Sequence, residues 1–340
     1  MKPKADIATI AGIVGVSKTT VHFALHDKPG VSQPVRERIL AVAQEIGYRP
    51  NRLAMALRTR RSATLGVVMG QMGSFQGELL ASLEKSAQAR GFNLLWANAS
   101  LEPQREREQM ELMLEKAVEG LIVTPTDSEA NRSYYEDLLE QGTPLVCVDY
   151  EVPGLAADLV ASDHFRGGYL AADRLIRGGR RRLAMLLKVR TEPAVVTSDR
   201  RDGFRAAVAE HGLEPAAELG VPTGPPQLVM RAAYEAVRDH LQEVPDLDGL
   251  FAFNDGLAYP AIAALQAAGR NVPRDVAVIG HDDWEASAYY SPPLSTIRQP
   301  VEEIGARATE LLIGRLQGEI TGPPQRILIE PSLVTRESCG

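Results

Sequence analysis

From residue 62 onward, short apolar runs alternate with longer amphipathic stretches, and this alternation most constrains the fold. Buried strands that alternate with helices form parallel sheets built from right-handed βαβ units. Two successive sets of runs therefore predict two similar α/β lobes with a cleft between them. The runs are TLGVVMG, NLLWANA, GLIVTP and PLVCVDY in the first set, and RLAMLLKV, GLFAFND and VAVIGHDDW in the second. Helices are expected near 76–90, 103–118, 131–141, 164–178, 199–211, 227–243 and 255–269.

Residues 1–47 differ from this body, because they indicate three short helices and no strand. Apolar residues recur at helical spacing from Ile7 to Val14, and Gly15 is a suitable stop because glycine adopts the left-handed conformation at low cost. Ser17 is a good N-cap for a second helix. A helix, a glycine turn and a second short helix predict a helix-turn-helix, whose second helix fits the major groove of B-DNA.

The predicted second helix would present Lys18, Thr19 and His22 on the face opposite its apolar residues. Lysine donates to guanine, threonine contacts a thymine methyl or a phosphate, and histidine donates or accepts a hydrogen bond. The hydroxyls of Ser17 and Thr20 suit phosphates. An αα-hairpin without a ligand is the alternative interpretation of the same pattern.

Charge separates this head from the body. Residues 1–61 contain eleven Lys and Arg and four Asp and Glu, a formal charge of +7. The whole chain is −7, so the remainder carries −14. A basic head on an acidic body is the asymmetry expected when one end meets a polyanion, although a solvated basic face would look alike.

The sequence of residues 48–61, YRPNRLAMALRTRR, predicts a linker. Pro50 prevents continuation of the third helix, and Asn51 can cap a brief helical piece. Met55 and Leu57 are apolar residues with little core nearby. They are either loop residues that pack on the body or a minor-groove wedge between base steps, with the arginines beside phosphates.

Motifs along essentially the whole chain are similar, in the same order, to those of the lac-repressor (LacI/GalR) family of bacterial transcription regulators. They are ATIAGIVGVSKTTVHFALHDKPGVSQPVRERILAVAQEIGYRPNRLAMALR, TLGVVMG, DHFRGGYLAADRLIRGGRRRLAML, DRRDGF, FAFNDGLAYPAIAAL, VAVIGHDDW, PPLSTIRQP, VEEIGARATELLIGRL and LVTRES. The resemblance implies an all-α helix-turn-helix head plus an α/β body resembling periplasmic binding proteins. It divides the chain into a DNA-binding head (1–47), a hinge helix or linker (48–61) and an effector-binding and dimerisation core (62–340).

Within this core, we expect the segments LSTIRQP and RILIEPSLV to cross back between the lobes. Lobe 1 would then comprise about 62–161 and 296–325, and lobe 2 about 162–295 and 326–340.

The resemblance also implies roles for single residues. The expected base contacts are Lys18, Thr19, His22 and Phe23, and the expected contacts to the DNA backbone are Ser17, Thr20, Tyr48 and Asn51. Met55 and Leu57 would enter the minor groove. The expected effector-binding residues, near the carboxyl ends of strands, are Gln71, Asp149, Tyr150, Arg200, Asn254 and Asp282.

Four residues, at three places in the chain, depart from the family pattern. His22 and Phe23 stand where Ser-Arg is usual, so we expect a different operator. Leu228 lies near the place of a stacking aromatic residue, and His164 replaces a usual asparagine. These changes bear on the identity of the effector more than on the class of protein.

These observations favour an effector-responsive DNA-binding regulator, expected to be a repressor of a carbohydrate-related operon. A solute-binding protein without DNA function is the alternative. An enzyme is not expected, because no nucleophile, acid and base set is evident. We expect no metal, because two adjacent carboxylates, Asp282 and Asp283, are weak evidence for a metal site, and no cofactor, because GQMGSFQG lacks the GK[ST] ending of a phosphate loop.

The expected partners are an inverted-repeat operator, a sugar-like effector and a second copy of the chain. A homodimer is expected rather than a tetramer, because no leucine heptad follows LVTRESCG. No run approaches the ~20 apolar residues that span a bilayer, and no secretory signal is evident. Cys147 and Cys339 are expected as free thiols, which fits the cytoplasm.

Overall fold

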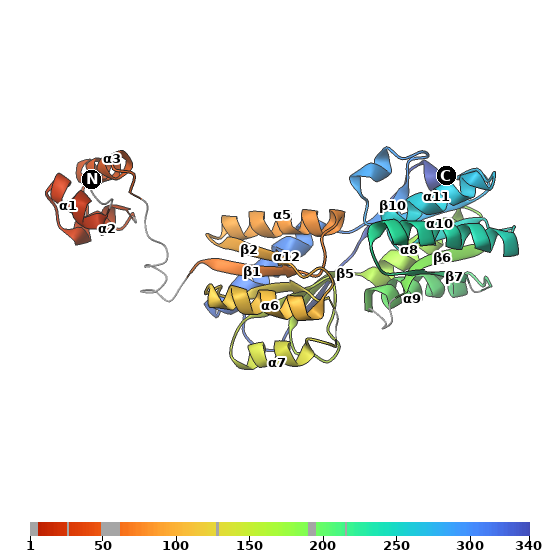
Figure 1. Cartoon of the computed structure of the whole chain (residues 1–340), viewed down its shortest axis with the longest axis horizontal. Coiled ribbons are helices and arrows are strands. Elements are labelled where there is room, and N and C mark those ends of the chain that lie inside the picture. Colours follow the sequence, from red (N-terminus) through yellow and green to blue (C-terminus); the bar gives the residue numbers. More distant parts are fainter. Residues whose placement is uncertain (1–5, 26, 49–61, 127–128, 190–194, 215) are drawn as a thin grey trace. The chain divides into compact units, whose positions relative to one another are not determined.

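The computed structural model describes residues 6–25, 27–48, 62–126, 129–189, 195–214 and 216–340. The chain divides into two compact units, Met1–Ser62 and Ala63–Gly340, and each is described by itself. Figure 1 shows the order of the elements along the chain.

The first unit is a small helical head with its own core. Its described helices are α1 (Ile7–Val14), α2 (Lys18–Leu25) and α3 (Gln33–Glu45). Ile10, Val21 and Ile39, one from each helix, are fully buried together. Apolar residues at helical spacing thus form the shared core that the sequence predicted.

Two turns set the geometry of this head. Helix α1 ends at Gly15, which is left-handed at φ 77°. Ser17 Oγ then accepts a hydrogen bond of 3.1 Å from the backbone N–H three residues later, at the start of α2. The predicted helix stop and the predicted cap are both confirmed. The turn between α2 and α3 is held by Arg36, which donates to the carbonyls of Ala24 and Lys28.

The second unit contains two sheets with the same winding order. Sheet A runs β11-β5-β4-β3-β1-β2 and sheet B runs β12-β10-β9-β8-β6-β7. The strand pairs are parallel except β10 with β12. Sheet A comprises β1 (Thr64–Met69), β2 (Asn93–Asn98), β3 (Leu121–Thr124), β4 (Leu145–Val148), β5 (Asp158–Ser162) and β11 (Arg326–Ile329). Sheet B comprises β6 (Leu183–Val189), β7 (Ala217–Pro222), β8 (Gly249–Ala252), β9 (Ala277–His281), β10 (Ser295–Arg298) and β12 (Ser332–Val334).

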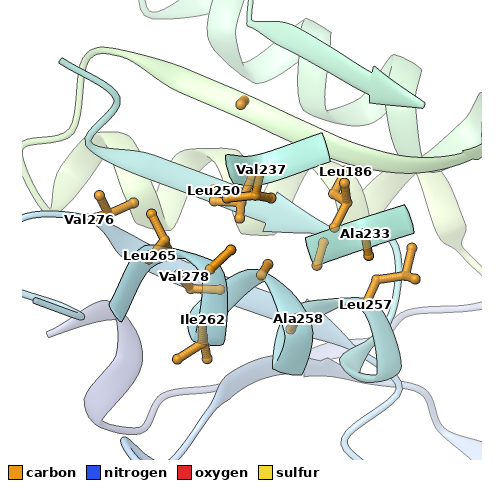
Figure 2. Packing of buried hydrophobic residues seen from close by; sticks show 14 of the residues in the cluster. Leu186, Ala233, Val237, Leu250, Leu257, Ala258, Ile262, Leu265, Val276 and Val278 are labelled. Atoms are coloured by element: carbon orange, nitrogen blue, oxygen red, sulfur yellow. The ribbon is translucent and has the colours of Figure 1, made fainter. Parts of the chain in front are cut away.

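Helices cover both faces of each sheet, as Figure 1 shows. In the lobe of sheet A, α5 (Ser74–Ala89) and α12 (Val301–Gln317) cover one face, and α6 (Pro103–Glu115) and α7 (Arg132–Glu140) the other. In the lobe of sheet B, the pairs are α10 (Pro226–Glu243) with α11 (Asp255–Ala267), and α8 (His164–Arg177) with α9 (Val195–Glu210). Figure 2 shows one of these four cores, where Val237, Ile262 and Leu265 pack against Leu250 and Val278 of the sheet. The predicted pair of similar α/β lobes is confirmed.

The chain crosses between the lobes three times, and two crossings lie away from their expected places. Strand β10 (Ser295–Arg298) pairs with β9, so residues 296–298 belong to lobe 2 rather than to lobe 1. Strand β11 pairs with β5, so residues 326–329 belong to lobe 1 rather than to lobe 2. The expected boundaries at 295/296 and 325/326 were therefore wrong by one strand each. Backbone pairing decides which sheet a strand joins, and an isolated apolar run does not reveal its partner.

Two strands, β5 and β7, lie in segments that the sequence analysis did not single out at all. Strand β5 is fully buried but offers only three apolar residues in a row. Strand β7 lies at the edge of sheet B and alternates between exposed and more buried residues. Among the described residues, no single helix is long and apolar enough to cross a membrane. Only α1 and α2 taken together pass that test by length and composition, and they are bent by 106° at their junction.

Helices α8 and α9 pack backbone to backbone at two glycines. A Cβ at Gly168 would lie 1.9 Å from the carbonyl oxygen of Arg200, and a Cβ at Gly203 would lie 1.9 Å from that of Phe165. Neither obstacle is a flexible side-chain end, so any larger residue would push the helices apart. The contact at Gly168 also fixes the position of the Arg200 backbone within α9.

A buried carboxylate joins α11 to the loop after β9. Asp255 is fully buried and accepts hydrogen bonds from Thr296 Oγ1 (2.6 Å), Ser287 Oγ (2.6 Å) and the Trp284 backbone N–H (2.8 Å). Burial raises the pKa of Asp255 to about 7, although these hydrogen bonds act in the opposite direction. The loop that carries Trp284 is thus tied to the first turn of α11.

We expect Gly168→Ala to lower the free energy of unfolding of the second unit by about 1–3 kcal/mol, because the new methyl group meets backbone. Gly77→Ala is the matched control, since a Cβ at Gly77, on the exposed side of α5, meets nothing within 4 Å. This control should change stability by less than ~1 kcal/mol and in the stabilising direction. Urea unfolding followed by circular dichroism measures both, and equal effects would contradict the close packing.

We expect Asp255→Asn to change the pH dependence of stability. Between about pH 4 and pH 7, folded Asp255 keeps a proton that the unfolded chain releases, because its pKa is about 7 in the folded state. Its contribution to stability therefore falls as pH rises through that window, by at most about 1.4 kcal/mol per pH unit. The difference in unfolding free energy between the unmodified chain and the variant should shrink accordingly from pH 4.5 to pH 7. A difference independent of pH would show that Asp255 is ionised throughout.

Candidate functional site

One face of α2 in the head is exposed and polar. Lys18 and Thr19 are exposed, while Val21 and Ala24 of the same helix are buried against α1 and α3. Lys18 and Thr19 are thus exposed on the face that the sequence predicted, while their contact with bases stays a prediction. The Ser17 and Thr20 hydroxyls lie 2.8 Å apart, so both already take part in the helix cap.

The unusual pair in this helix is only half-exposed. The rings of His22 and Phe23 lie 6.3 Å apart between centroids. The Phe23 ring faces the turn that follows. Lys28 Nζ lies 5.8 Å from the ring centroid, and a Cβ at Gly30 would lie 3.9 Å from Phe23 Cδ2. Part of the Phe23 ring therefore packs against this turn within the head. Tyr48 is also half-buried, against the same small core. The other expected DNA contacts, Asn51, Met55 and Leu57, lie outside the described residues.

A cleft in the second unit brings together all six of the expected effector residues. Its volume is about 320 Å³, within the range of small-molecule sites. Gln71, Asp149 and Tyr150 follow strands of sheet A, Asn254 and Asp282 follow strands of sheet B, and Arg200 comes from α9. Open α/β sheets bind ligands at these carboxyl ends, where the strand order reverses. In each sheet here, the order reverses between the first and third strands of the lobe, β1 and β3 or β6 and β8.

Arg200 contacts other residues that line this cleft. It is 3% exposed. Its Nη1 donates to the carbonyl of Phe253 (2.7 Å), its Nε donates to His164 Nδ1 (3.2 Å), and its Nη2 lies 3.5 Å from Asp282 Oδ1. The guanidinium also lies over the Phe253 ring, 4.5 Å from the centroid. A guanidinium has five N–H donors, so these three contacts orient the group and leave donors for a ligand.

His164 joins the two lobes. Because Arg200 Nε–H donates to Nδ1, the proton of the neutral ring lies on Nε2, which donates to Asp149 Oδ1 at 2.9 Å. Asp149 follows β4 of lobe 1, whereas His164 begins α8 of lobe 2 directly after the first crossing. Both side chains are buried. The sequence identified this position as a departure from the family but not as part of the site.

Asp282 completes the network on the other side. Burial would raise its pKa, but the Arg200 charge and the hydrogen bonds from His281 and Gln299 hold the pKa of Asp282 well below its usual range. Gln299 Nε2 donates to Asp282 Oδ1 at 2.7 Å, and Gln299 lies at the second crossing. Burial and the Arg200 charge lower the pKa of His281 to about 3, so its ring is neutral and donates to the same oxygen. Arg200 is therefore linked to the first crossing by hydrogen bonds through His164, and to the second by its ion pair with Asp282, which Gln299 also contacts.

Aromatic and other apolar side chains make up much of the remaining wall. The additional residues are Met72, Phe75, Pro226, Val229, Met230, Phe253, Leu257, Tyr259 and Trp284, together with the polar Gln76, Lys188 and Gln299. Leu228 is 60% exposed and does not line the cleft. The sequence analysis missed this wall, because its apolar and aromatic members come from four separate segments.

No group of three His, Cys, Asp or Glu that could hold a metal ion occurs among the described residues. Asp283 instead forms ion pairs with Arg298 (2.6 Å) and Arg336 (2.7 Å), and Asp282 faces Arg200. Both carboxylates of the adjacent pair are therefore balanced by arginines.

Comparison with known proteins matches both units. The family model "Bacterial regulatory proteins, lacI family" matches residues 6–51, and "Periplasmic binding protein-like domain" matches residues 172–339. The chain is 30% identical over 340 residues to the transcriptional regulator DegA of Bacillus subtilis, covering 98% of each chain. It is 30% identical over 341 residues to the ribose operon repressor of Escherichia coli K12, covering 98% of this chain and 99% of that one.

A solved structure of the regulator CelR in complex with cellobiose has a similar fold. Its TM-score is 0.71 at 28% identity, and the match covers 98% of this chain and 99% of that one. The matched head disfavours the alternative of a solute-binding protein without DNA function, since the lacI model covers the predicted helix-turn-helix. The chain belongs to the lacI family of bacterial regulatory proteins, and it is a DNA-binding transcriptional regulator rather than an enzyme.

Proposed function

We propose that this chain acts in the cytoplasm as a homodimeric repressor of a carbohydrate-related operon, controlled by a sugar or sugar derivative bound in the cleft. The observation that carries the proposal is the convergence of six polar and aromatic residues from both lobes on one cleft, around the oriented guanidinium of Arg200. This arrangement suits a small molecule with several hydroxyls.

The chemistry of the cleft supports a sugar. Arg200 offers N–H donors, the carboxylate of Asp282 accepts, and the amides of Gln71 and Asn254 can do both. Asn254 Oδ1 already accepts from the backbone N–H of Leu257 at 3.1 Å, so its amide N–H₂ is the part left for a ligand. The names of two relatives agree with this class, since one represses a ribose operon and another is solved with cellobiose.

The links between the lobes support a mechanism. A ligand that touches both lobes favours one lobe arrangement by its difference in affinity for the two arrangements. His164 ties Arg200 to lobe 1 through Asp149, and Gln299 ties Asp282 to the second crossing. A change at Arg200 therefore reaches both crossings. Couplings of this kind typically amount to about 1–3 kcal/mol, or about 5- to 150-fold in operator affinity.

DNA binding belongs to the head and the linker. Lys18, Thr19, His22 and Phe23 are proposed to read bases from α2, with Ser17, Thr20, Tyr48 and Asn51 on the backbone and Met55 and Leu57 in the minor groove. Two heads related by a two-fold axis read two half-sites, which is why we propose a dimer and an inverted-repeat operator. The exposure of Lys18 and Thr19 supports this arrangement.

Selection from a random duplex library with the full-length chain tests the proposed DNA function. We expect an enriched inverted repeat, and we expect the double substitution His22→Ser and Phe23→Arg to enrich a different half-site. The substitution Arg38→Ala, on α3, serves as a charge control and should leave the selected sequence unchanged. An unchanged half-site in the double variant would remove His22 and Phe23 from the base contacts. No enrichment with or without cell metabolites would contradict the proposed function.

We expect His164→Ala to uncouple the lobes. The change removes the donor to buried Asp149 and the acceptor of Arg200 Nε, so the free energy of unfolding should fall by about 1–3 kcal/mol. The effector should also change operator affinity less in this variant, as measured by fluorescence anisotropy of a labelled operator. His211→Ala is the control, because His211 pairs with Asp173 at 3.0 Å but is partly exposed at the surface, and its loss should cost less than ~1 kcal/mol. Equal effects of the two variants would argue against a link between the lobes at His164.

A further inference from the structure

Trp284 lines one wall of the cleft, and the loop that carries it is held by contacts of Trp284 itself and of its neighbours in sequence. Its backbone N–H and Ser287 Oγ donate to the same oxygen of Asp255, at 2.8 and 2.6 Å. The preceding residue, Asp283, is held between Arg298 and Arg336. The backbone that carries Trp284 is therefore fixed before any ligand arrives, and a fixed contact loses little conformational entropy on binding.

The orientation of the indole follows from what covers its edges. Gly256 lies under the benzene edge, since a Cβ there would lie 2.6 Å from Cη2 and 2.9 Å from Cζ3 of Trp284. Tyr259 meets the ring edge-on, with centroids 6.2 Å apart and planes at 63°. The indole Nε1 is buried as well, without an acceptor among the described residues. Trp284 is nonetheless partly exposed, so we infer that the face of the ring is the surface that the cleft can use.

The rest of the cleft complements such a face. Phe75 and Tyr150 line it from lobe 1, so aromatic surface lies on both sides of the space. Asp282 precedes Trp284 by two residues, and Arg200 lies 3.5 Å from its carboxylate. A ring compound with one apolar face and a hydrogen-bonding edge would match both kinds of surface, because aromatic faces stack on apolar faces while charged groups bind edges.

We propose that Trp284 is a fixed stacking platform that determines specificity for the effector, selecting ring compounds whose apolar face lies on the indole and whose polar edge reaches Arg200 and Asp282. The proposal rests on the effector function proposed above for the same cleft. Sugars and nucleobases share this chemistry, since a sugar offers a C–H face and a nucleobase a π face.

Intrinsic fluorescence can report this contact directly. The chain has two tryptophans, and Trp96, which is 49% exposed on β2, does not line the cleft. Trp96→Phe therefore leaves Trp284 as the single indole. The full-length Trp96→Phe protein is tested against D-ribose, cellobiose, hypoxanthine and, as acyclic controls, citrate and glutamate. Melting temperature detects binding, and Trp284 emission detects stacking.

We expect a ring compound to raise the melting temperature and to change Trp284 emission together. In the unmodified background, Trp284→Ala should weaken its binding about 10-fold or more, while Trp284→Phe should retain affinity within about 5-fold, because a smaller aromatic face remains. Binding only of ribose or cellobiose would assign a saturated ring, and binding only of hypoxanthine a planar one. Both would support the platform.

Two results would overturn the proposal, and a third would separate it from the regulatory function proposed above. A ligand that binds Trp284→Ala as tightly as the unmodified chain, without changing emission, would leave the cleft function intact but remove the platform. Stabilisation by citrate or glutamate alone, or by no ring compound, would overturn the ring-compound class. A ring compound that binds and stacks but leaves operator affinity unchanged would support the platform and contradict the proposed regulatory function, so the two failures are distinguishable.

Discussion

The body of this protein depends on how one buried guanidinium is neutralised. Removing a charge from water is costly unless partners replace the lost hydration, and Arg200 meets this demand with a carbonyl, an imidazole and a carboxylate. Its position is set by backbone packing, because helix α8 approaches the Arg200 carbonyl at Gly168, where a Cβ would lie 1.9 Å from that oxygen. The partners in turn come from different strands and helices. The charge therefore links secondary structure that the sheets alone would leave independent.

The repeated winding order explains why these partners meet. Both sheets place the carboxyl ends of their strands around the cleft, so the loops after β1, β4, β8 and β9 converge there. Three crossings connect the lobes, and the side chains at the first two, His164 and Gln299, belong to the Arg200 network. A ligand at Arg200 thus acts where the lobes are joined. Trp284 adds a rigid wall whose loop is held by Asp255.

Several features of the fold were predictable because they depend on neighbours in sequence. Gly15 and Ser17 end one helix and begin the next through local backbone geometry and a local hydrogen bond. Other features were not predictable, because they depend on residues that are distant in sequence. Strand β5 has too few apolar residues to stand out, and the partners of β10 and β11 depend on pairing with strands far away in sequence. The half-buried position of Phe23 likewise depends on the turn around Gly30.

The sequence by itself indicated the class of fold and the helix-turn-helix of the head, because periodicity and caps are read along the chain, and its resemblance to the lac-repressor family supplied the six residues expected at the cleft. Only the tertiary structure decided that His164 and Gln299 join the lobes to Arg200, and that Trp284 lines the cleft. The hydrogen bonds of His164 join residues that are 15 and 36 positions apart in the sequence, and partners at such separations are set by packing. Local preference brings each side chain to the end of its strand or helix, and only the closed packing of the lobes determines which side chains then touch.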